Sequence, residues 1–451
     1  MADGLLNKAS IILTPTGYKA GTLYNVAPVV EPYEDFDFAR ASVASRVNSS
    51  GLVEMVGRTL SSELVTCGDF SCADPNDYWT IENTWTFGSG VANGNGANGS
   101  SEQLVQSNVT TIGKTYLVSY EILNYVSGSL FLPNVGSVKS GNGIHTEYIT
   151  ATQTDLKVTG INFNGSITNV SFKEIIDTNN IPRISYDSNG ENGHILLEPT
   201  TTNLYLNTDT LSTQNVSTSA SEYSVSFYGT GTITFSGSYS GSLVGTGVND
   251  RVSLTFSATS GTLTSTVSGS VTNAQIENLG YSTSYMPSLS TQGVRATETA
   301  NGAGSADLIN STEGVLYAEI AALADDLTNR QMTLSDGSDN NRIVLKYDNQ
   351  SNVIQAFNRV GGVETAFLSA SVTDIKLFSK CALKYKVNDY ALWIDGIEVA
   401  TDTSSTTFSS STLNDFKFGD SGGSSNFYGK CKALAVFNEA LSDAELNNLT
   451  G

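Results

Sequence analysis

The chain has two histidines, and neither lies in a sequence that would activate a nucleophile. A serine–histidine–aspartate site needs a histidine within hydrogen-bond reach of the nucleophile. His145 lies in GNGIHTEY and His194 in GENGHILLEP, both beside turns. Neither sequence holds the strained turn that presents a nucleophilic serine. We therefore expect both histidines to be surface or loop residues without a catalytic role.

A glycan-cleaving site would instead need two carboxylates several ångströms apart. The chain has 44 acidic residues, so its composition leaves such a pair open. However, the last third lacks a strand with the spacing Glu-x-Asp-x-x-Glu, and the strand-like run YAEIAALADD carries a single glutamate, Glu319. We expect that the chain is not an enzyme, and we keep a glycan depolymerase as the less favoured alternative.

Three tryptophans are the candidates for stacking against a sugar ring, because glycan sites combine aromatic faces with a few orienting polar groups. Trp79 and Trp85 lie in DYWTIENTWTFG, where their even spacing would put both on one face of a strand. Trp393 alternates with its two aliphatic neighbours, and so faces away from the core if they face inward. The alternative that we favour is a structural role for each, as is usual for tryptophan.

The elements that carry these residues are predicted to be β-strands in several domains. The 451 residues suffice for about three or four domains of ordinary size. Hydrophobic residues make up 39%, enough for packed cores, and the 42 glycines fit short strands joined by tight turns. Alternation such as Tyr223, Val225 and Phe227 in EYSVSFYG, or Tyr116 and Val118 in TYLVSY, indicates half-buried strands. We expect an all-β protein made of tandem jelly-roll β-sandwiches.

The charge balance excludes nucleic acid as a partner. The chain carries 44 acidic and 23 basic residues, a net charge of −21, whereas binding to phosphates requires basic residues. An apolar run of about 18 residues, which would span a membrane, is absent from the sequence. The N-terminus lacks the apolar core and cleavage site of a signal peptide. Because four cysteines are too few for a disulfide framework, we expect folding in a cytoplasm.

Changes in pattern along the chain predict five segments. We expect an extended N-terminal attachment segment at 1–60, a β-sandwich at 61–178, a β-hairpin bridge at 179–209, a second sandwich at 210–300 and a third at 301–451. The first segment cannot form a core alone, so it must pack on later domains or on another protein. The last ends in a short helix, with Ser442 and Glu445 placed to form a capping box.

Two of these segments share an internal similarity. GSITNVSFKEI at 165–175 aligns with GSVTNAQIENL at 269–279, with four identical residues and similar neighbours. The alternative is chance similarity between two strands rich in serine and threonine. Because the same offset also aligns the starts of the two segments, we interpret the second sandwich as a repeat of the first.

The last segment resembles the laminin-G-like, concanavalin A-like sandwich. Two stretches carry the resemblance, ALKYKVNDYALWIDGIEV and FYGKCKALAVFNEALSDAEL, which contain a strand–turn–strand with Tyr-x-Leu-Trp-Ile-Asp-Gly and a terminal Val-Phe-Asn-x-x-Leu-Ser-Asp-x-Glu-Leu. They lie in roughly the last third of the chain. The resemblance implies a two-sheet sandwich of the kind found in lectins.

The rest of the chain resembles modular proteins of tailed phages and prophages, notably those of Bacteroidetes hosts. The resembling pieces are LLNKASIILTPTGYKAG, DFARASVASRVNSSGLVEMV, NIPRISYDSNGENGHILLEPTTTNLYLNTD and YSTSYMPSLSTQGVRATETA. In that class such pieces flank or join carbohydrate-binding-module-like jelly rolls, and 61–178 lies between two of them. The resemblance implies a structural head or tail fibre or decoration protein on the exterior of the virion. Its glycan-binding-type domains would serve adhesion to host or environmental surfaces.

The same resemblance sets the expected partners. Fibres resist shear by symmetric assembly, so a homotrimer is the first expectation and a dimer the second. Residues 1–60 would attach to other virion proteins, and the distal domains would contact cell-surface or mucosal glycans. The alternative is a purely structural capsid or tail component that binds no glycan.

Laminin-G-like domains often hold a calcium ion between neighbouring loops. The best candidate ligands are Asp336 and Asp339 in SDGSDNN, followed by Asp420 in GDSGGSSN. The alternative that we favour is turn chemistry, because aspartate and asparagine side chains bond to their own backbone in such loops. We expect that no cofactor is required and leave a calcium ion open.

Overall fold

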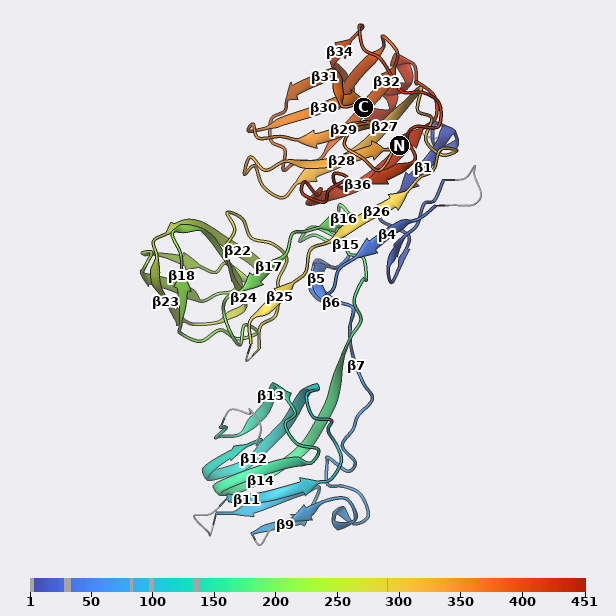
Figure 1. Cartoon of the computed structure of the whole chain (residues 1–451). Helices are drawn as coiled ribbons and strands as arrows, with labels where there is room; N and C mark the ends of the chain where they lie inside the picture. The colour runs from blue at the N-terminus through green and yellow to red at the C-terminus, as the bar shows by residue number, and fades with distance from the viewer. Residues whose placement is uncertain (1–3, 28–33, 82–83, 97–100, 133–137, 290) are drawn as a thin grey trace. The chain divides into compact units, whose positions relative to one another are not determined.

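A computed structural model describes residues 4–27, 34–81, 84–96, 101–132, 138–289 and 291–451 (Figure 1). Almost every element is a β-strand, so the prediction of an all-β chain is confirmed. The chain divides into two compact units: unit 2 is Arg58–Asp177, and unit 1 combines Met1–Gly57 with Thr178–Gly451. The bounds predicted for the inserted segment, 61–178, differ from those of unit 2 by only a few residues at each end.

Unit 2 is built around two long strands, β12 (Thr115–Phe131) and β14 (Leu156–Asp177). Its sheet has the order β13-β12-β14-β10-β9, with β7 and β11 also paired to β14 and β8 paired to β11. Tyr116, Val118 and Tyr120 of β12 are buried, as their alternation predicts. The other elements are β7 (Arg58–Leu60), β8 (Thr80–Ile81), β9 (Trp85–Gly88), β10 (Val91–Asn95), β11 (Ser101–Gln106), β13 (Gly143–Thr150) and a 3-10 helix at Pro75–Asp77.

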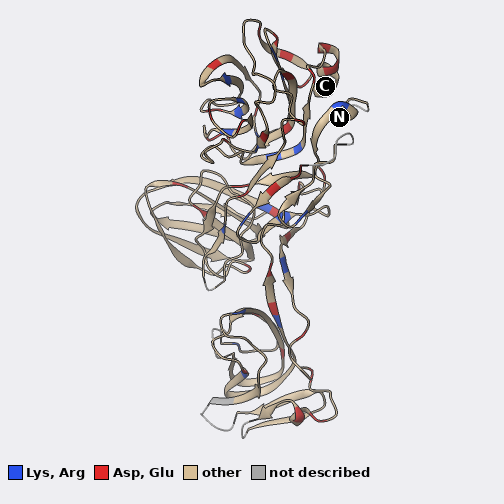
Figure 2. Ribbon diagram, turned by 45° about the vertical axis from the view of Figure 1, so that its right-hand side comes forward, with Lys and Arg blue, Asp and Glu red and all other residues tan. Residues whose placement is uncertain are grey.

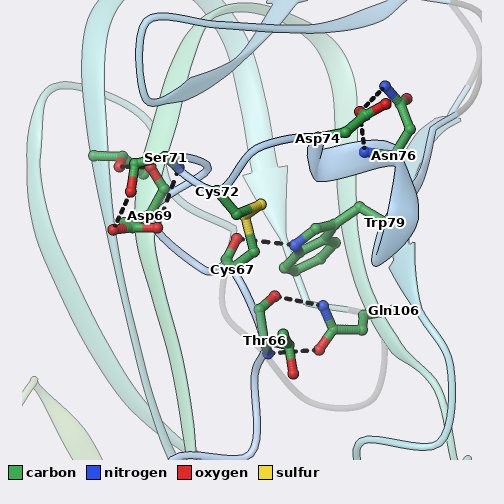
Figure 3. Close-up of a disulfide and its surroundings, with 10 residues drawn as sticks. Thr66, Cys67, Asp69, Ser71, Cys72, Asp74, Asn76, Trp79 and Gln106 are labelled. Atoms are coloured by element: carbon green, nitrogen blue, oxygen red, sulfur yellow. Dashed lines mark hydrogen bonds between the residues drawn. A yellow bond between two sulfur atoms is a disulfide. The ribbon is translucent and has the colours of Figure 1, made fainter.

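A disulfide joins Cys67 and Cys72 in the loop that opens unit 2 (Figure 3). The number of cysteines does not predict this pair, although the closeness of the two residues along the chain is the signal that could have found it. The indole N–H of Trp79 donates to the carbonyl oxygen of Cys67 at 3.1 Å. The Gln106 side chain bonds both backbone groups of Thr66, at 2.9 and 2.8 Å. The loop is therefore fixed to the core at the N-terminal end of the bridge.

We expect reduction of this disulfide to destabilise unit 2 by about 2 kcal/mol, because the bridge closes a short loop in the unfolded chain. Calorimetry with dithiothreitol should show a lower melting temperature for unit 2. Unit 1 should be unaffected, since its cysteines Cys381 and Cys431 are free and buried. A Cys67→Ser, Cys72→Ser double variant should melt like the reduced protein, and an equal shift of both units would contradict the prediction.

Unit 1 contains a sandwich of two small sheets that enclose one apolar core. One sheet has the order β18-β23-β20-β21 and the other β22-β19-β24, and the pair β17–β25 lies next to them in sequence. Tyr223, Val225 and Phe227 of β19 are buried in this core. The bounds are β17 (Thr201–Asn203), β18 (Gln214–Thr218), β19 (Ser221–Gly229), β20 (Thr232–Gly237), β21 (Gly241–Val244), β22 (Gly247–Ala258), β23 (Gly261–Ser268), β24 (Val271–Glu277) and β25 (Gly293–Arg295).

The internal similarity has a structural counterpart in a shared β-bulge. Asn169 in β14 and Asn273 in β24 occupy corresponding positions of the two similar stretches, and both have a positive φ, 54° and 47°. At each of them the register with the neighbouring strand shifts. Asparagine tolerates this left-handed conformation better than most residues.

The backbone hydrogen bonds around the two bulges also correspond. Val170 donates its N–H to the carbonyl of Gly68, and Ala274 donates to that of Thr208. A leucine lies four residues before each acceptor and makes a second bond to the same strand. Leu64 donates its N–H to the carbonyl of Phe172, and Leu204 donates to that of Ile276. Matching bonds at matching positions make a chance similarity of sequence a poor explanation.

The C-terminal part of unit 1 is a larger sandwich whose two sheets enclose a second core. One sheet has the order β15-β16-β36-β27-β32-β33-β34, with β1 also on β36, and the other the order β2-β3-β4-β26-β35-β28-β29-β30-β31. The bounds of its C-terminal strands are β26 (Thr299–Ala303), β27 (Glu313–Ala322), β28 (Arg330–Ser335), β29 (Arg342–Tyr347), β30 (Val353–Val360), β31 (Val363–Ser371), β32 (Ser379–Lys386), β33 (Tyr390–Ile394), β34 (Ile397–Asp402), β35 (Asp415–Lys417) and β36 (Gly429–Phe437).

Strands from the start and the middle of the chain complete this sandwich. They are β1 (Ala9–Leu13), β2 (Tyr18–Lys19), β3 (Thr22–Leu23), β4 (Phe36–Ala39), β15 (Ile184–Ser185) and β16 (His194–Leu197), while β5 (Ala44–Val47) and β6 (Val53–Val56) form a separate hairpin. Ile11, Leu23 and Phe36 are fully buried in its core. Strands β1 to β4 are therefore part of the sandwich, and the prediction of an extended attachment segment at 1–60 is wrong for them, because a free segment would expose these apolar side chains to water.

The chain ends in the helix α1 (Asp443–Thr450), with the capping box between Ser442 and Glu445 that the sequence predicts. It covers the outer face of the sheet that contains β33. In the part of the chain that the structure describes, no helix has the length and apolarity to cross a membrane.

A buried group of five charged residues lies where the segments of unit 1 meet, and we call it the charge cluster: Arg40, Arg183, Glu198, Arg295 and Glu298. Ribbon segments with basic and with acidic residues lie near one another in this part of unit 1 (Figure 2). Arg183 bonds Glu198 at 2.8 Å and also bonds Glu298, while Arg40 bonds Glu298 at 2.6 Å and Arg295 bonds Glu198 at 3.0 Å. All five side chains are at most 3% exposed.

The members of the charge cluster come from the sequence pieces that lie outside the C-terminal signature. Arg40 follows β4, Arg183 precedes β15, Glu198 follows β16, Arg295 ends β25 and Glu298 precedes β26. Burial alone would raise the pKa of Glu198, but attraction to Arg295 and Arg183 lowers it to about 2. Glu198 therefore stays ionised at neutral pH, and the ion pairs of the cluster join three of the four resembling pieces in one network.

Candidate functional site

The three tryptophans do not offer exposed stacking faces. Trp79 and Trp85 are each 2% exposed in the core of unit 2, and Trp393 is 7% exposed. Trp393 faces away from Leu392 as its alternation predicts, but α1 and the segment around β1 cover that side of the sheet. The structure therefore supports the structural alternative for Trp79, Trp85 and Trp393 rather than the glycan-binding one.

The histidines differ from each other. His145 is half-buried on β13, whereas His194 is 5% exposed on β16, so the expectation of a surface or loop residue is wrong for His194. Its Nδ1 lies 2.8 Å from the carbonyl oxygen of Asn192, and its ring packs against Phe378. The apolar run that follows it in GHILLEP was the signal for a buried strand.

The three aspartates considered as calcium ligands make local bonds instead. Asp336 accepts from the backbone N–H and hydroxyl of Ser338, and Asp420 accepts from the same groups of Ser424. Asp339 pairs with Arg342. Within the described ranges, no three histidine, cysteine or acidic residues are grouped as a metal site would require. Turn chemistry thus accounts for Asp336 and Asp420.

A different group of residues forms the best candidate for binding, on the outer face of the sheet in the C-terminal sandwich. We call it the β29–β31 face: Arg342, Lys346, Gln355, Phe357, Arg359 and Phe367. On these strands, residues such as Ile343, Leu345 and Ile354 enter the core. Their alternating neighbours must therefore point away from it. The register places Phe357 beside Phe367 and Gln355 beside Lys346.

Three cationic side chains surround Phe357. The guanidinium carbons of Arg342 and Arg359 lie 5.3 and 5.9 Å from the ring centroid, and Lys346 Nζ lies 5.5 Å from it. Phe357 is 7% exposed, whereas Phe367 is 48% exposed. Burial and repulsion from Arg359 lower the pKa of Arg342, although Asp339 opposes this, and the guanidinium stays charged.

Several polar groups of this face have unused hydrogen-bonding capacity. The Nε atoms of Arg342 and Arg359 and the Oε1 atom of Gln355 are buried without a partner. Arg342 and Lys346 pair with aspartates, but Arg359 forms no ion pair with any described residue. Buried polar groups normally have partners. The face therefore offers donors, one acceptor and an exposed aromatic ring to a ligand.

Sequence reasoning missed this face although it recognised the strands. RIVLKYD and VIQAFNRV place arginine and lysine on the polar side of their alternation. Only the register between β29 and β30, which no pattern within a single strand specifies, brings Arg342, Lys346 and Arg359 around one phenylalanine. Clustered cations in a chain of net charge −21 are the signal that could have found them.

The comparisons with known proteins agree with the fold of the C-terminal part. A family model described as the concanavalin A-like lectin/glucanases superfamily matches residues 321–447. The C-terminal sandwich is thus a concanavalin A-like domain, as its sequence resemblance implies, although β1 to β4, β15 and β16 of this chain add strands from outside that match. A search of curated proteins found no match.

Solved structures resemble parts of the chain at low identity. A carbohydrate-binding module, CBM40, of a Ruminococcus gnavus sialidase, bound to α2,3-sialyllactose, is 19% identical, with 34% of this chain and 94% of that chain covered and a TM-score of 0.29. Domain 4 of an arabinanase from Geobacillus stearothermophilus, in complex with arabinotriose, is 11% identical, with 39% and 84% covered and a TM-score of 0.29. A heptameric pentraxin from Limulus polyphemus is 9% identical, with 34% and 74% covered and a TM-score of 0.27.

Proposed function

We propose that this chain is a non-enzymatic adhesion protein that binds acidic glycans through the β29–β31 face of its concanavalin A-like domain. The observation that carries the proposal is the group of three cations around Phe357, next to the exposed ring of Phe367. A lectin-like fold supports a glycan as the ligand.

The chemistry of the face favours a glycan with carboxylate groups. Arginine binds a carboxylate through two parallel hydrogen bonds, and Arg359 has no carboxylate partner among the described residues. Phe367 can pack against the apolar face of a sugar ring. The whole chain is strongly acidic, so most of its surface repels an anionic glycan. The three cations weaken this repulsion at the β29–β31 face.

We further propose that the protein acts as a fibre or decoration protein on the exterior of a tailed-phage particle, as a homotrimer or, less favourably, a dimer. The support is the resemblance of the four sequence pieces, three of which contribute to the charge cluster. Attachment through residues 1–60 would use their exposed side, since their apolar side packs in the sandwich. Detection of the protein on intact particles by antibody labelling, with light scattering for its oligomeric state, tests this part.

The glycan proposal predicts selective binding on an array that contains both acidic and neutral glycans. Phe367→Ala and Arg359→Gln should each weaken binding to an acidic glycan roughly tenfold or more, and added salt should weaken it further. Leu377→Ala and Lys376→Gln, which change an exposed apolar and an exposed basic residue elsewhere, are matched controls. Point variants are preferable to deleting 301–451, because deletion would expose the buried sides of β1 and β4.

Equal binding of neutral and acidic glycans would contradict the role of the cations. No binder at all, with host adsorption unchanged in the Phe367→Ala variant, would favour the purely structural alternative. New reducing ends or unsaturated sugars after incubation with the bound glycan would show a depolymerase.

A further inference from the structure

A second site lies at the junction of unit 1, separate from the β29–β31 face. Its cavity has a volume of about 220 Å³, and four parts of unit 1 line it: the β5–β6 hairpin, the bridge with β15 and β16, the first sandwich and the C-terminal sandwich. The side chains that carry the argument are Tyr186, His194, Tyr228, Arg251, Ser282 and Lys430. The cavity is smaller than the roughly 300–1,000 Å³ usual for drug-sized ligands, so it fits one small molecule.

Two cations line this cavity without carboxylate partners. Among the described residues, neither Arg251 nor Lys430 forms an ion pair, and the nearby Glu198 is already bound by Arg183 and Arg295. Arg251 uses Nη2 to bond Ser226 and Thr283, while its Nε is buried without a partner. Burial lowers the pKa of Lys430, although Glu198 and Asp187 attract it. Both cations are half-buried, so a carboxylate entering the cavity can pair with them without displacing an existing ion pair.

The remaining polar groups suit hydroxyls. The 2.8 Å contact from His194 Nδ1 to the Asn192 carbonyl places the ring proton on Nδ1 and leaves Nε2 as an acceptor. Burial lowers the pKa of His194 to about 4, so the ring is neutral at pH 7. The hydroxyl of Ser282 is buried without a partner. Gly193 leaves room for the Tyr186 ring, since a Cβ at that position would lie 2.8 Å from a ring carbon.

We propose that this cavity binds a single sugar acid, whose carboxylate lies between Arg251 and Lys430 and whose hydroxyls bond His194, Ser282 and the tyrosines. Apolar side chains such as Leu196 and Leu323 complete the wall. A ligand here would contact all four parts of unit 1 at once. It would therefore stabilise the folded junction by mass action.

Isothermal titration of the full chain tests the site with galacturonate, glucuronate and N-acetylneuraminate as probes, and with galactose, phosphate and sulfate as comparisons. At least one sugar acid should bind at millimolar concentration or below and raise the melting temperature of unit 1, with galactose roughly tenfold weaker or more. Lys430→Met and Arg251→Met should each weaken binding roughly tenfold or more. Lys386→Met, at an exposed ion pair, is the matched control.

The outcomes separate this site from the glycan-binding face. Phe367→Ala and Arg359→Gln should leave the titration unchanged, because neither residue lines the cavity. If a methionine variant fails to fold, Lys430→Gln and Arg251→Gln remove the same charges and keep a polar side chain in the cavity wall. Absence of binding by every sugar acid, or unchanged affinity in the folded variants, overturns the proposal. Phosphate or sulfate binding as tightly as the sugar acids overturns the ligand class and leaves a general anion site.

Discussion

Replacing Arg183 with methionine is expected to lower the free energy of unfolding of unit 1 by about 3–5 kcal/mol, because it leaves buried carboxylates without their partner. Arg183 bonds both Glu198 and Glu298 and also donates to the Ser45 carbonyl at 2.8 Å and the Ser284 hydroxyl at 2.6 Å. No other member of the charge cluster contacts both glutamates. Its loss would remove the bonds that hold both glutamates, Ser45 and Ser284 around one side chain.

Calorimetry of the full chain measures this effect, with the transition of unit 2 identified by its shift on disulfide reduction. Lys386→Met removes an exposed ion pair with Glu313 and should cost at most about 1 kcal/mol. Glu298→Gln is a second test, because it leaves Arg40 and Arg183 facing a neutral amide. A loss below about 1 kcal/mol in both cluster variants would mean that water or relaxation compensates the charges.

The sequence predicts the strands of this chain better than their partners. Alternation in β12, β19 and β29 depends on which side of each strand is buried, and this pattern is local. The pairing of β1 with β36 joins residues more than 400 positions apart, as Ala9 and Phe437 show. The apolar pattern of β1, ASIIL, does not indicate which strand it pairs with. This is why the sequence predicts an extended segment at 1–60, although β1 to β4 complete the C-terminal sandwich.

The candidate sites were harder to predict, for a related reason. The charge cluster uses one or two residues from each of several pieces, and a lone arginine such as Arg183 is typical of a surface. Its burial depends on Glu198 and Glu298 arriving from elsewhere in the chain. The tryptophans show the converse case. A tryptophan side chain suggests stacking on a sugar, but Trp79 and Trp85 are buried in the core of unit 2. Trp393 is buried under the elements that cover β33.

Trp85 provides the second large expected effect. We expect Trp85→Ala to destabilise unit 2 by about 3–5 kcal/mol, since it removes a large buried ring and leaves a cavity. The indole stacks on Phe163 at 5.7 Å between ring centroids. A Cβ at Gly94 or Gly160 would lie 3.6 or 3.3 Å from its ring atoms, so the two glycines leave a slot that the ring fills. Neighbouring strands cannot easily close that slot.

Far-UV circular dichroism during urea unfolding measures this change without depending on tryptophan emission. Tyr78→Ala, at a 47% exposed position of the same unit, is the control and should change stability by about 0.5 kcal/mol or less. The same variant also separates the two roles considered for Trp85. If the ring were a sugar platform, Trp85→Ala would abolish glycan binding while unit 2 kept its stability. If the ring is a core residue, unit 2 loses stability and binding at the β29–β31 face of unit 1 persists, because Trp85 belongs to a separate core.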